Sequence, residues 1–288
     1  MLDRELARKL MEVENLPTLP AVMQQLLAAV ENEASSAADI TSILERDIAI
    51  SARILRLANS AFYGLRHKVD TIRRAVVVVG FDVVRMLALA TSVFDLFSQR
   101  QQYALDPEDF WLHSLGAAKA SQLLAREIPG AQPSDSCFTA GLLHDMGKYF
   151  LALALKDTYK DVLEMAERSQ CLLCEIEKDA LAITHCEVAY WLAQKWSLPP
   201  VIADAIGNQC RVGDYDGPFW REVSIVSLAS DVARHARFGK AGDFSPVTLR
   251  GEPLARLALN ADLVLGIVDQ LSEYHGEAKH FLNALRGR

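Results

Sequence analysis

Apolar residues recur along most of the chain with the period of an amphipathic α-helix. Val22, Leu26 and Val30, for example, follow the i, i+4 spacing that places side chains on one helix face. The same pattern predicts further helices at 110–127, 135–155, 159–168, 175–183, 187–196, 200–209, 219–238 and 262–285, the last with a break near Gly276. We therefore expect an all-α protein in the form of a multi-helix bundle.

Local signals support helices in the first hundred residues as well. Asp39 and Asp47 each precede apolar positions and are candidate N-caps. The run Val76–Val79 has strand propensity, but Thr71 can cap a helix that continues through it. Because the chain has no second run of this kind with which it could pair, we expect helix here.

A polar segment from Gln99 to Pro107 is the candidate boundary between two subdomains. We expect a helical N-terminal subdomain in residues 1–105, packed on a second helical bundle in residues 106–288. A basic cluster in the first part is expected to be a solvated face or, alternatively, a contact for an acidic partner. It consists of Arg66, His67, Lys68, Arg73 and Arg74.

The composition is that of a globular protein without a general attraction to nucleic acid. Hydrophobic residues make up 51% and charged residues 23%, and the net charge is −7. Such a balance supports a sizeable core, and it disfavours direct binding to polyanions. We expect no direct nucleic-acid partner.

Neither an export signal nor a membrane-spanning segment is predicted. The N-terminus is charged, and the longest apolar stretch, Val76 to Ala90, is interrupted by Asp82 and Arg85. The five cysteines lack a secreted-framework spacing, and the pair Cys171 and Cys174 is expected to be buried and inert. We expect reduced cysteines, a cytoplasmic location and no membrane insertion.

The strongest chemical signal is the adjacent pair His144-Asp145 within Gly141–Lys148. An imidazole nitrogen and a carboxylate oxygen can bind the same cation. His113 lies on an earlier predicted helix, and Asp231 interrupts an apolar face on a later one. These four side chains could converge in a bundle core, which is where helical proteins place metal sites. Each histidine taken alone could equally be a hydrogen-bonded core residue.

The order His, His-Asp, Asp resembles the HD superfamily of metal-dependent phosphohydrolases. The resemblance implies that His113, His144, Asp145 and Asp231 hold a divalent metal ion (Fe, Mn, Mg, Ni or Zn), whose bound water attacks a phosphoester. It also implies a phosphate contact by Lys148, which could otherwise be an exposed helix charge.

A narrower resemblance, to the HDOD family of bacterial signalling output domains, covers roughly Leu16 to Asp231. It is carried by Leu16-Pro17-Thr18-Leu19-Pro20, Ile43–Asp47, Leu57–Gly64, Ile72–Ala75, Gly141–Gly147 and Trp196–Pro199. The resemblance implies an all-helical fold whose second half is the HD-like bundle with the metal site. His185 could match a further metal-binding histidine of the related HD-GYP phosphodiesterases, or simply begin its helix. Gly207–Cys210 stands where those enzymes have a His-His pair, so we do not expect a two-metal hydrolase.

Two functions follow from these resemblances. The first is a regulatory output protein that is not an efficient enzyme and acts mainly by contacting a signalling protein. Such a partner would be a histidine kinase, a response regulator or a cyclic-dinucleotide enzyme. The second is a metal-dependent phosphohydrolase that acts on a nucleotide or another phosphoester.

Overall fold

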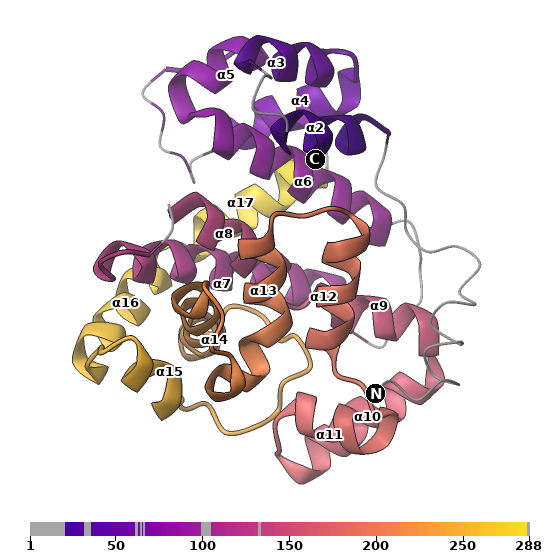
Figure 1. Ribbon diagram of the computed structural model, residues 1–288, viewed down its shortest axis with the longest axis vertical. Coiled ribbons are helices and arrows are strands. Elements are labelled where there is room, and N and C mark those ends of the chain that lie inside the picture. Colours follow the sequence, from indigo (N-terminus) through magenta and orange to yellow (C-terminus); the bar gives the residue numbers. More distant parts are fainter. Residues whose placement is uncertain are drawn as a thin grey trace. The chain divides into compact units, whose positions relative to one another are not determined.

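The computed structural model describes residues 21–31, 36–60, 63, 65, 67–98, 105–131 and 134–286. Every regular element in these ranges is helical, so the expected all-α fold is confirmed (Figure 1). The motif Leu16–Pro20 lies outside the described residues. Within the ranges that are described, no helix combines the length and apolarity needed to cross a membrane.

By its contacts the chain divides into two units. Of the described residues, those from 105 to 273 form unit 1, and those from 21 to 98 and from 274 to 286 form unit 2. The change from unit 2 to unit 1 thus falls between residues 98 and 105, at the polar segment Gln99–Pro107. Unit 2 also includes the last helix, because this helix packs on an early helix of that unit. By its contacts, the last helix therefore belongs with residues of the expected N-terminal range 1–105, and not with the rest of the expected range 106–288.

Unit 2 is a bundle of helices from both ends of the chain. Three consecutive helices of this unit, α4, α5 and α6, contact one another, and α17 packs on α4. The helices are α2 (Ala21–Glu31), α3 (Ala37–Glu45), α4 (Ile48–Ala58), α5 (Ile72–Val79), α6 (Phe81–Ser98) and α17 (His275–Leu285). The last two helices of the chain are separated at Tyr274, close to the break expected near Gly276.

Polar caps begin three helices of unit 2. Asp47 accepts a hydrogen bond from Ile50 N at the start of α4, as expected. The expected cap Asp39 was wrong, because Ser36 is the N-cap of α3 and Asp39 is its third residue. The two side chains form a reciprocal capping box, and Asp39 bonds back to Ser36 N at 2.9 Å.

The valine run is helical, and it forms most of α5. Thr71 caps this helix by accepting a hydrogen bond from Arg74 N at 3.2 Å. Ile72 and Ala75 face the core, whereas Val77 and Val78 are exposed. The expectation of a helix is therefore confirmed, since a cap and one buried face were enough to outweigh strand propensity.

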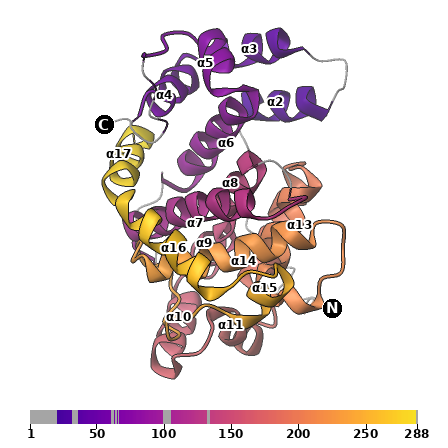
Figure 2. The same ribbon diagram turned by 90° about the vertical axis from the view of Figure 1, so that its left-hand side faces the viewer.

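Unit 1 is built around α7 and α14, which lie side by side in both views (Figures 1 and 2). Almost every residue of α7 from Phe110 to Ala125 is buried. The helices of this unit are α7 (Pro107–Glu127), α8 (Ser134–Leu143), α9 (Met146–Leu155), α10 (Asp157–Ser169), α11 (Leu173–Leu181), α12 (His185–Lys195), α13 (Pro200–Asn208), α14 (Trp220–His235), α15 (Gly251–Arg256), α16 (Ala261–Glu273) and the 3₁₀-helix η2 (Gln209–Asp214).

The helix expected over 135–155 is interrupted at His144-Asp145, which separates α8 from α9. At this break Asp145 has φ −99° and ψ 6°, outside the helical range. Gly147 follows, and a Cβ atom there would collide with the backbone oxygen of His185. Because it is glycine, the start of α9 can lie directly against α12. Periodicity alone did not reveal this interruption, since apolar residues continue through it.

The cysteines differ from expectation. Cys186, at the start of α12, and Cys210, in η2, form a disulfide. Cys171 is exposed and Cys174 half-buried, so these two are not a buried pair. Burial raises the pKa of Cys174 to about 12, which keeps this thiol protonated and unreactive, as expected of an inert cysteine.

Candidate metal centre

His113, His144 and Asp145 meet in the core of unit 1. His113 comes from the middle of α7, and the other two from the break between α8 and α9. The exposed fractions of the three side chains are 1%, 0% and 2%. Each offers one ligand atom, and these atoms all lie within 4.8 Å of one another. Three of the four side chains that the sequence placed together are therefore neighbours.

The ring of His144 is oriented as a metal ligand would be. Its Nδ1 lies 2.7 Å from the carbonyl oxygen of Gly141. A carbonyl only accepts hydrogen bonds, so Nδ1 carries the proton, and in the neutral ring Nε2 carries a lone pair. This Nε2 lies 3.3 Å from Oδ2 of Asp145 and has no hydrogen-bond partner among the described residues.

His113 approaches the same carboxylate oxygen. Its Nε2 lies 3.7 Å from Oδ2 of Asp145 and 3.3 Å from the hydroxyl oxygen of Ser230. Burial, followed by the proximity of His144, lowers the pKa of His113 to about 3. His113 is therefore neutral near pH 7 and brings a lone pair, not a positive charge, to the cluster.

His185, the first residue of α12, lies next to the cluster. Its Nε2 lies 3.6 Å from the other carboxylate oxygen of Asp145, Oδ1. Its Nδ1 lies 2.6 Å from Oε2 of Glu177, which also accepts a hydrogen bond from His185 N. A buried carboxylate behind the far nitrogen is the arrangement that orients histidine ligands of metals. Glu177 had not been predicted as part of the site, because no motif surrounds it.

Lys148 is part of the buried cluster, so the alternative of an exposed helix charge was wrong. Only 1% of its surface is exposed, and its Nζ lies 2.9 Å from Oδ2 of Asp145. Nζ also donates a hydrogen bond to Asp243, from the loop after α14. Burial by itself would lower the pKa of Lys148, but the two carboxylates raise it above its usual value. Lys148 is thus a protonated amine held between two acids.

The two acids are correspondingly ionised. Burial opposes the charged form of Asp145, yet His144 and Lys148 hold its pKa well below the usual range. Burial also opposes the charged form of Asp243, but the nearby charge of Lys148 lowers the pKa of Asp243 to about 2. The sequence drew no attention to Asp243, which lies in a loop 95 residues beyond Lys148.

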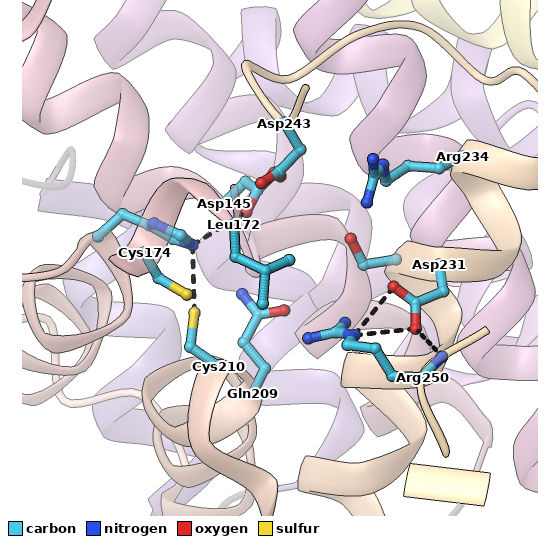
Figure 3. Close-up of a pocket in the computed structure, with 11 residues that line it drawn as sticks. Asp145, Leu172, Cys174, Gln209, Cys210, Asp231, Arg234, Asp243 and Arg250 are labelled. Atoms are coloured by element: carbon cyan, nitrogen blue, oxygen red, sulfur yellow. Dashed lines mark hydrogen bonds and ion pairs between the residues drawn. The ribbon is translucent and has the colours of Figure 1, made fainter. Parts of the chain in front are cut away.

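Asp231 lines the same pocket as Asp145 and His185, but it is not in the three-residue cluster (Figure 3). Its carboxylate is paired with Arg250, whose Nε lies 2.9 Å from Oδ2 and 3.0 Å from Oδ1. The backbone N–H of Arg250 donates a third hydrogen bond, at 3.0 Å. Arg250 was not anticipated as its partner. Asp231 therefore has a basic partner of its own within the protein.

The donor set fits a divalent cation. Nε2 atoms of His113, His144 and His185 surround an ionised carboxylate, and nitrogen and oxygen ligands of this kind suit Zn, Fe, Mn and similar ions. The unpartnered Nε2 of His144, completely buried, is the observation that supports this assignment. His113, His144 and Asp145 are the residues that would hold such an ion, and His185 lies beside them at the other carboxylate oxygen of Asp145.

Comparison with known proteins assigns the chain to a family. Residues 16–212 match the family described as the HDOD domain. A crystal structure of an HDOD domain protein from Geobacter sulfurreducens is 26% identical, with a TM-score of 0.75 over 93% of this chain and 87% of that one. A structure from Shewanella amazonensis SB2B is 27% identical, with a TM-score of 0.74 over 97% of each chain.

Among curated proteins, one from Treponema pallidum is 25% identical over 227 residues, which are 77% of this chain and 43% of that protein. The chain spans less than half the length of the curated relatives it matches. The family match covers more than half of the chain and includes His113, His144, Asp145 and His185. This chain belongs to the HDOD family.

Proposed function

We propose that this protein is a regulatory output protein in signal transduction, which acts mainly by contacting another protein. Membership of the HDOD family supports the signalling role. The proposed partner is a signalling protein, either a histidine kinase, a response regulator or a cyclic-dinucleotide enzyme. The cluster of His113, His144 and Asp145 in unit 1, called the HD-like centre below, would then bind a divalent cation in a structural or regulatory role.

The observation that carries this proposal is the pairing of both acids with basic side chains of the protein itself. Lys148 neutralises Asp145, and Arg250 neutralises Asp231. A hydrolytic metal centre uses such carboxylates as ligands that bring negative charge to the cation. Because both acids are already engaged by basic side chains, the cluster is better suited to holding helices together than to rapid turnover.

Helix α5 offers a surface for the proposed contact. Val77 is 78% exposed and Val78 51% exposed, although large aliphatic side chains are more often buried. Arg73 and Arg74 are exposed on the same short helix. Exposed apolar side chains bordered by charges are typical of protein interfaces. We propose that this face contacts the partner, with the arginines opposite acidic groups.

The contact proposal is tested by purification of the tagged protein from its native host and identification of the proteins that co-purify. We expect a signalling protein to co-purify with the wild type and to be lost from Val77→Glu. Val247→Glu is the matched control, because Val247 is 48% exposed but lies in unit 1. Loss from both variants, or from neither, would refute the assignment of the contact to α5.

The alternative function is a metal-dependent phosphohydrolase. The unpartnered Nε2 of His144 beside ionised Asp145 favours it, because a bound cation there would supply an activated water as nucleophile. The Shewanella amazonensis relative is named as a candidate phosphohydrolase. In this reading Lys148 would have to leave a carboxylate to contact a phosphate.

A panel of nucleotides and phosphoesters, assayed with the metal-loaded protein, separates the two functions. We expect no turnover at ordinary enzymatic rates. Turnover that is lost in His144→Ala and Asp145→Ala would establish the hydrolase reading. Turnover that survives both substitutions would be assigned to a contaminant.

A further inference from the structure

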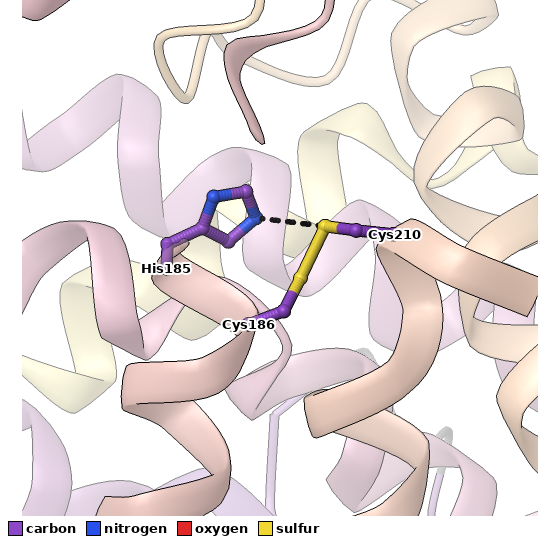
Figure 4. A group of neighbouring side chains, drawn as sticks. All are labelled: His185, Cys186 and Cys210. Atoms are coloured by element: carbon purple, nitrogen blue, oxygen red, sulfur yellow. Dashed lines mark hydrogen bonds between the residues drawn. A yellow bond between two sulfur atoms is a disulfide. The ribbon is translucent and has the colours of Figure 1, made fainter. Parts of the chain in front are cut away.

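A second cluster of metal-ligating side chains lies beside the HD-like centre. His185, Cys186 and Cys210 offer ligand atoms that all lie within 4.8 Å of one another (Figure 4). The two sulfurs are joined as a disulfide between α12 and η2, across 24 residues of sequence. Nε2 of His185 lies 3.5 Å from Sγ of Cys210. Two sulfurs and an imidazole nitrogen thus face one another.

We propose that reduction of the Cys186–Cys210 disulfide opens a second metal site, in which both thiolates and Nε2 of His185 bind a thiophilic cation of the Zn²⁺ class. Two cysteines and one histidine form a known type of zinc ligand set with a fourth position left open. Cys210 and His185 both line the pocket of unit 1, and Cys210 is half-buried, so it is the sulfur that faces the pocket. The proposal does not depend on the proposed function.

A dithiol reductant breaks the S–S bond by thiol–disulfide exchange, and is itself oxidised to a disulfide while two thiols form on the protein. Binding of Zn²⁺ then forms two Zn–S bonds and releases the two thiol protons to solvent. Oxidation of the thiols to the disulfide removes both ligands. The same pair of sulfurs therefore cannot form a disulfide and ligate metal together.

The environment of His185 supports a role as ligand in this site. Glu177, which is completely buried, holds Nδ1 of the ring and leaves Nε2 directed to Cys210. Glu177 is held in turn by the hydroxyl of Tyr159, which donates a hydrogen bond of 2.7 Å to Oε1. Carboxylate partners of this kind fix the tautomer and orientation of metal-binding histidines.

One imidazole is shared between the two clusters. Nε2 of His185 lies 3.6 Å from Oδ1 of Asp145 and 3.5 Å from Sγ of Cys210. A single lone pair can bind only one cation at a time. The thiol site, when formed, therefore removes His185 from the HD-like centre, and the redox state of the cysteine pair controls which cluster uses the ring.

The test is a Co²⁺ titration of the full-length protein followed by absorption spectroscopy. One sample is reduced with a dithiol and desalted without oxygen, and the other is kept oxidised. Cobalt bound by thiolates shows sulfur-to-metal charge-transfer absorption, whereas cobalt bound by nitrogen and oxygen does not. We expect this band in the reduced sample alone, and its disappearance when excess Zn²⁺ displaces cobalt. A reduced sample that binds cobalt without the band would overturn the proposal.

Variants assign the ligands. Cys186→Ser and Cys210→Ser should each abolish the band, and Cys171→Ser, at an exposed cysteine outside the pocket, should keep it. Glu177→Gln should weaken cobalt binding by roughly 10–100-fold. If the band is retained in Cys210→Ser, the assignment is refuted. It is also refuted if Cys174→Ser is the variant that loses the band, because the site would then lie elsewhere. Circular dichroism establishes that each variant is folded. The comparison of reduced with oxidised wild-type protein tests the proposal even if a variant does not fold.

Discussion

The ammonium of Lys148 lies 2.9 Å from Oδ2 of Asp145, the same oxygen that faces Nε2 of His144. The acid of the HD pair thus has a cation supplied by the protein itself, three residues further along the chain. Lys148 also forms an ion pair with a second acid, Asp243. Whether an external cation binds therefore depends on competition with a buried lysine.

Removal of this internal cation is expected to destabilise the protein and to favour metal binding. In Lys148→Met, the buried Asp145 and the half-buried Asp243 lose their basic partner, which should cost about 3–5 kcal/mol of unfolding free energy. Added Mn²⁺ should restore more stability to this variant than to the wild type, because it replaces the missing charge. Chemical denaturation with and without Mn²⁺ measures both effects. Lys160→Met, at an exposed lysine, is the control, and an equal response of the two variants would contradict the prediction.

The pair Asp231–Arg250 is expected to behave as a coupled unit. Arg250→Met leaves the buried Asp231 carboxylate without its side-chain partner and should cost about 1–3 kcal/mol. The value is below that of a fully buried pair, because the Arg250 side chain is 28% exposed. Asp231→Asn in the Arg250→Met background should recover part of the loss. A double-mutant cycle in urea measures the coupling, and strictly additive effects would argue against the pair.

Stability of the metal-free protein is expected to fall as the pH falls below about 6.5. The pKa of His113 is lowered to about 3, so the unfolded chain takes up a proton at this residue at a higher pH than the folded protein. The pKa of Asp243 is lowered to about 2, which adds a second loss between about pH 4 and pH 2. Unfolding by urea at several pH values, after treatment with a chelator, tests this. In His113→Gln the loss that begins near pH 6.5 should be smaller, and an unchanged profile would exclude His113 as its source.

Glu177 is expected to matter for the HD-like centre as well as for the thiol site. With the disulfide intact, Glu177→Gln should weaken binding of Mn²⁺ or Zn²⁺ by roughly 10–100-fold, because His185 loses the carboxylate that orients it. Isothermal titration calorimetry measures the affinity. Asp179→Asn, an exposed acid on the same helix, is the control. Equal affinities for Glu177→Gln and wild type would mean that His185 does not ligate metal in the oxidised protein.

Much of the fold could be predicted because helices are encoded by local periodicity. The spacing of Val22 and Leu26 and the cap at Thr71 predicted helices that the structure contains. Errors arose where two local signals competed. Asp39 looked like a cap because it precedes apolar residues, but Ser36 takes that position and uses Asp39 as its capping-box partner.

The candidate site was predictable to the extent that its residues lie in a motif. His144 and Asp145 are adjacent, and His113 precedes them on the helix that packs against α8, so the motif placed the three correctly. Lys148 was expected at the phosphate or in solvent. Instead it is buried and paired with Asp243, which lies in the loop after α14. No local sequence pattern predicts where this loop runs.

The amino-acid sequence by itself determined that the chain is helical, where most helices lie, and which histidines and acids could form a metal centre. Only the tertiary structure decided the partners: Lys148 with Asp243, Arg250 with Asp231, and Cys186 with Cys210. The physical reason is that helical periodicity specifies which face of a segment is buried, whereas the packing of whole helices and loops specifies which distant side chains meet on those faces.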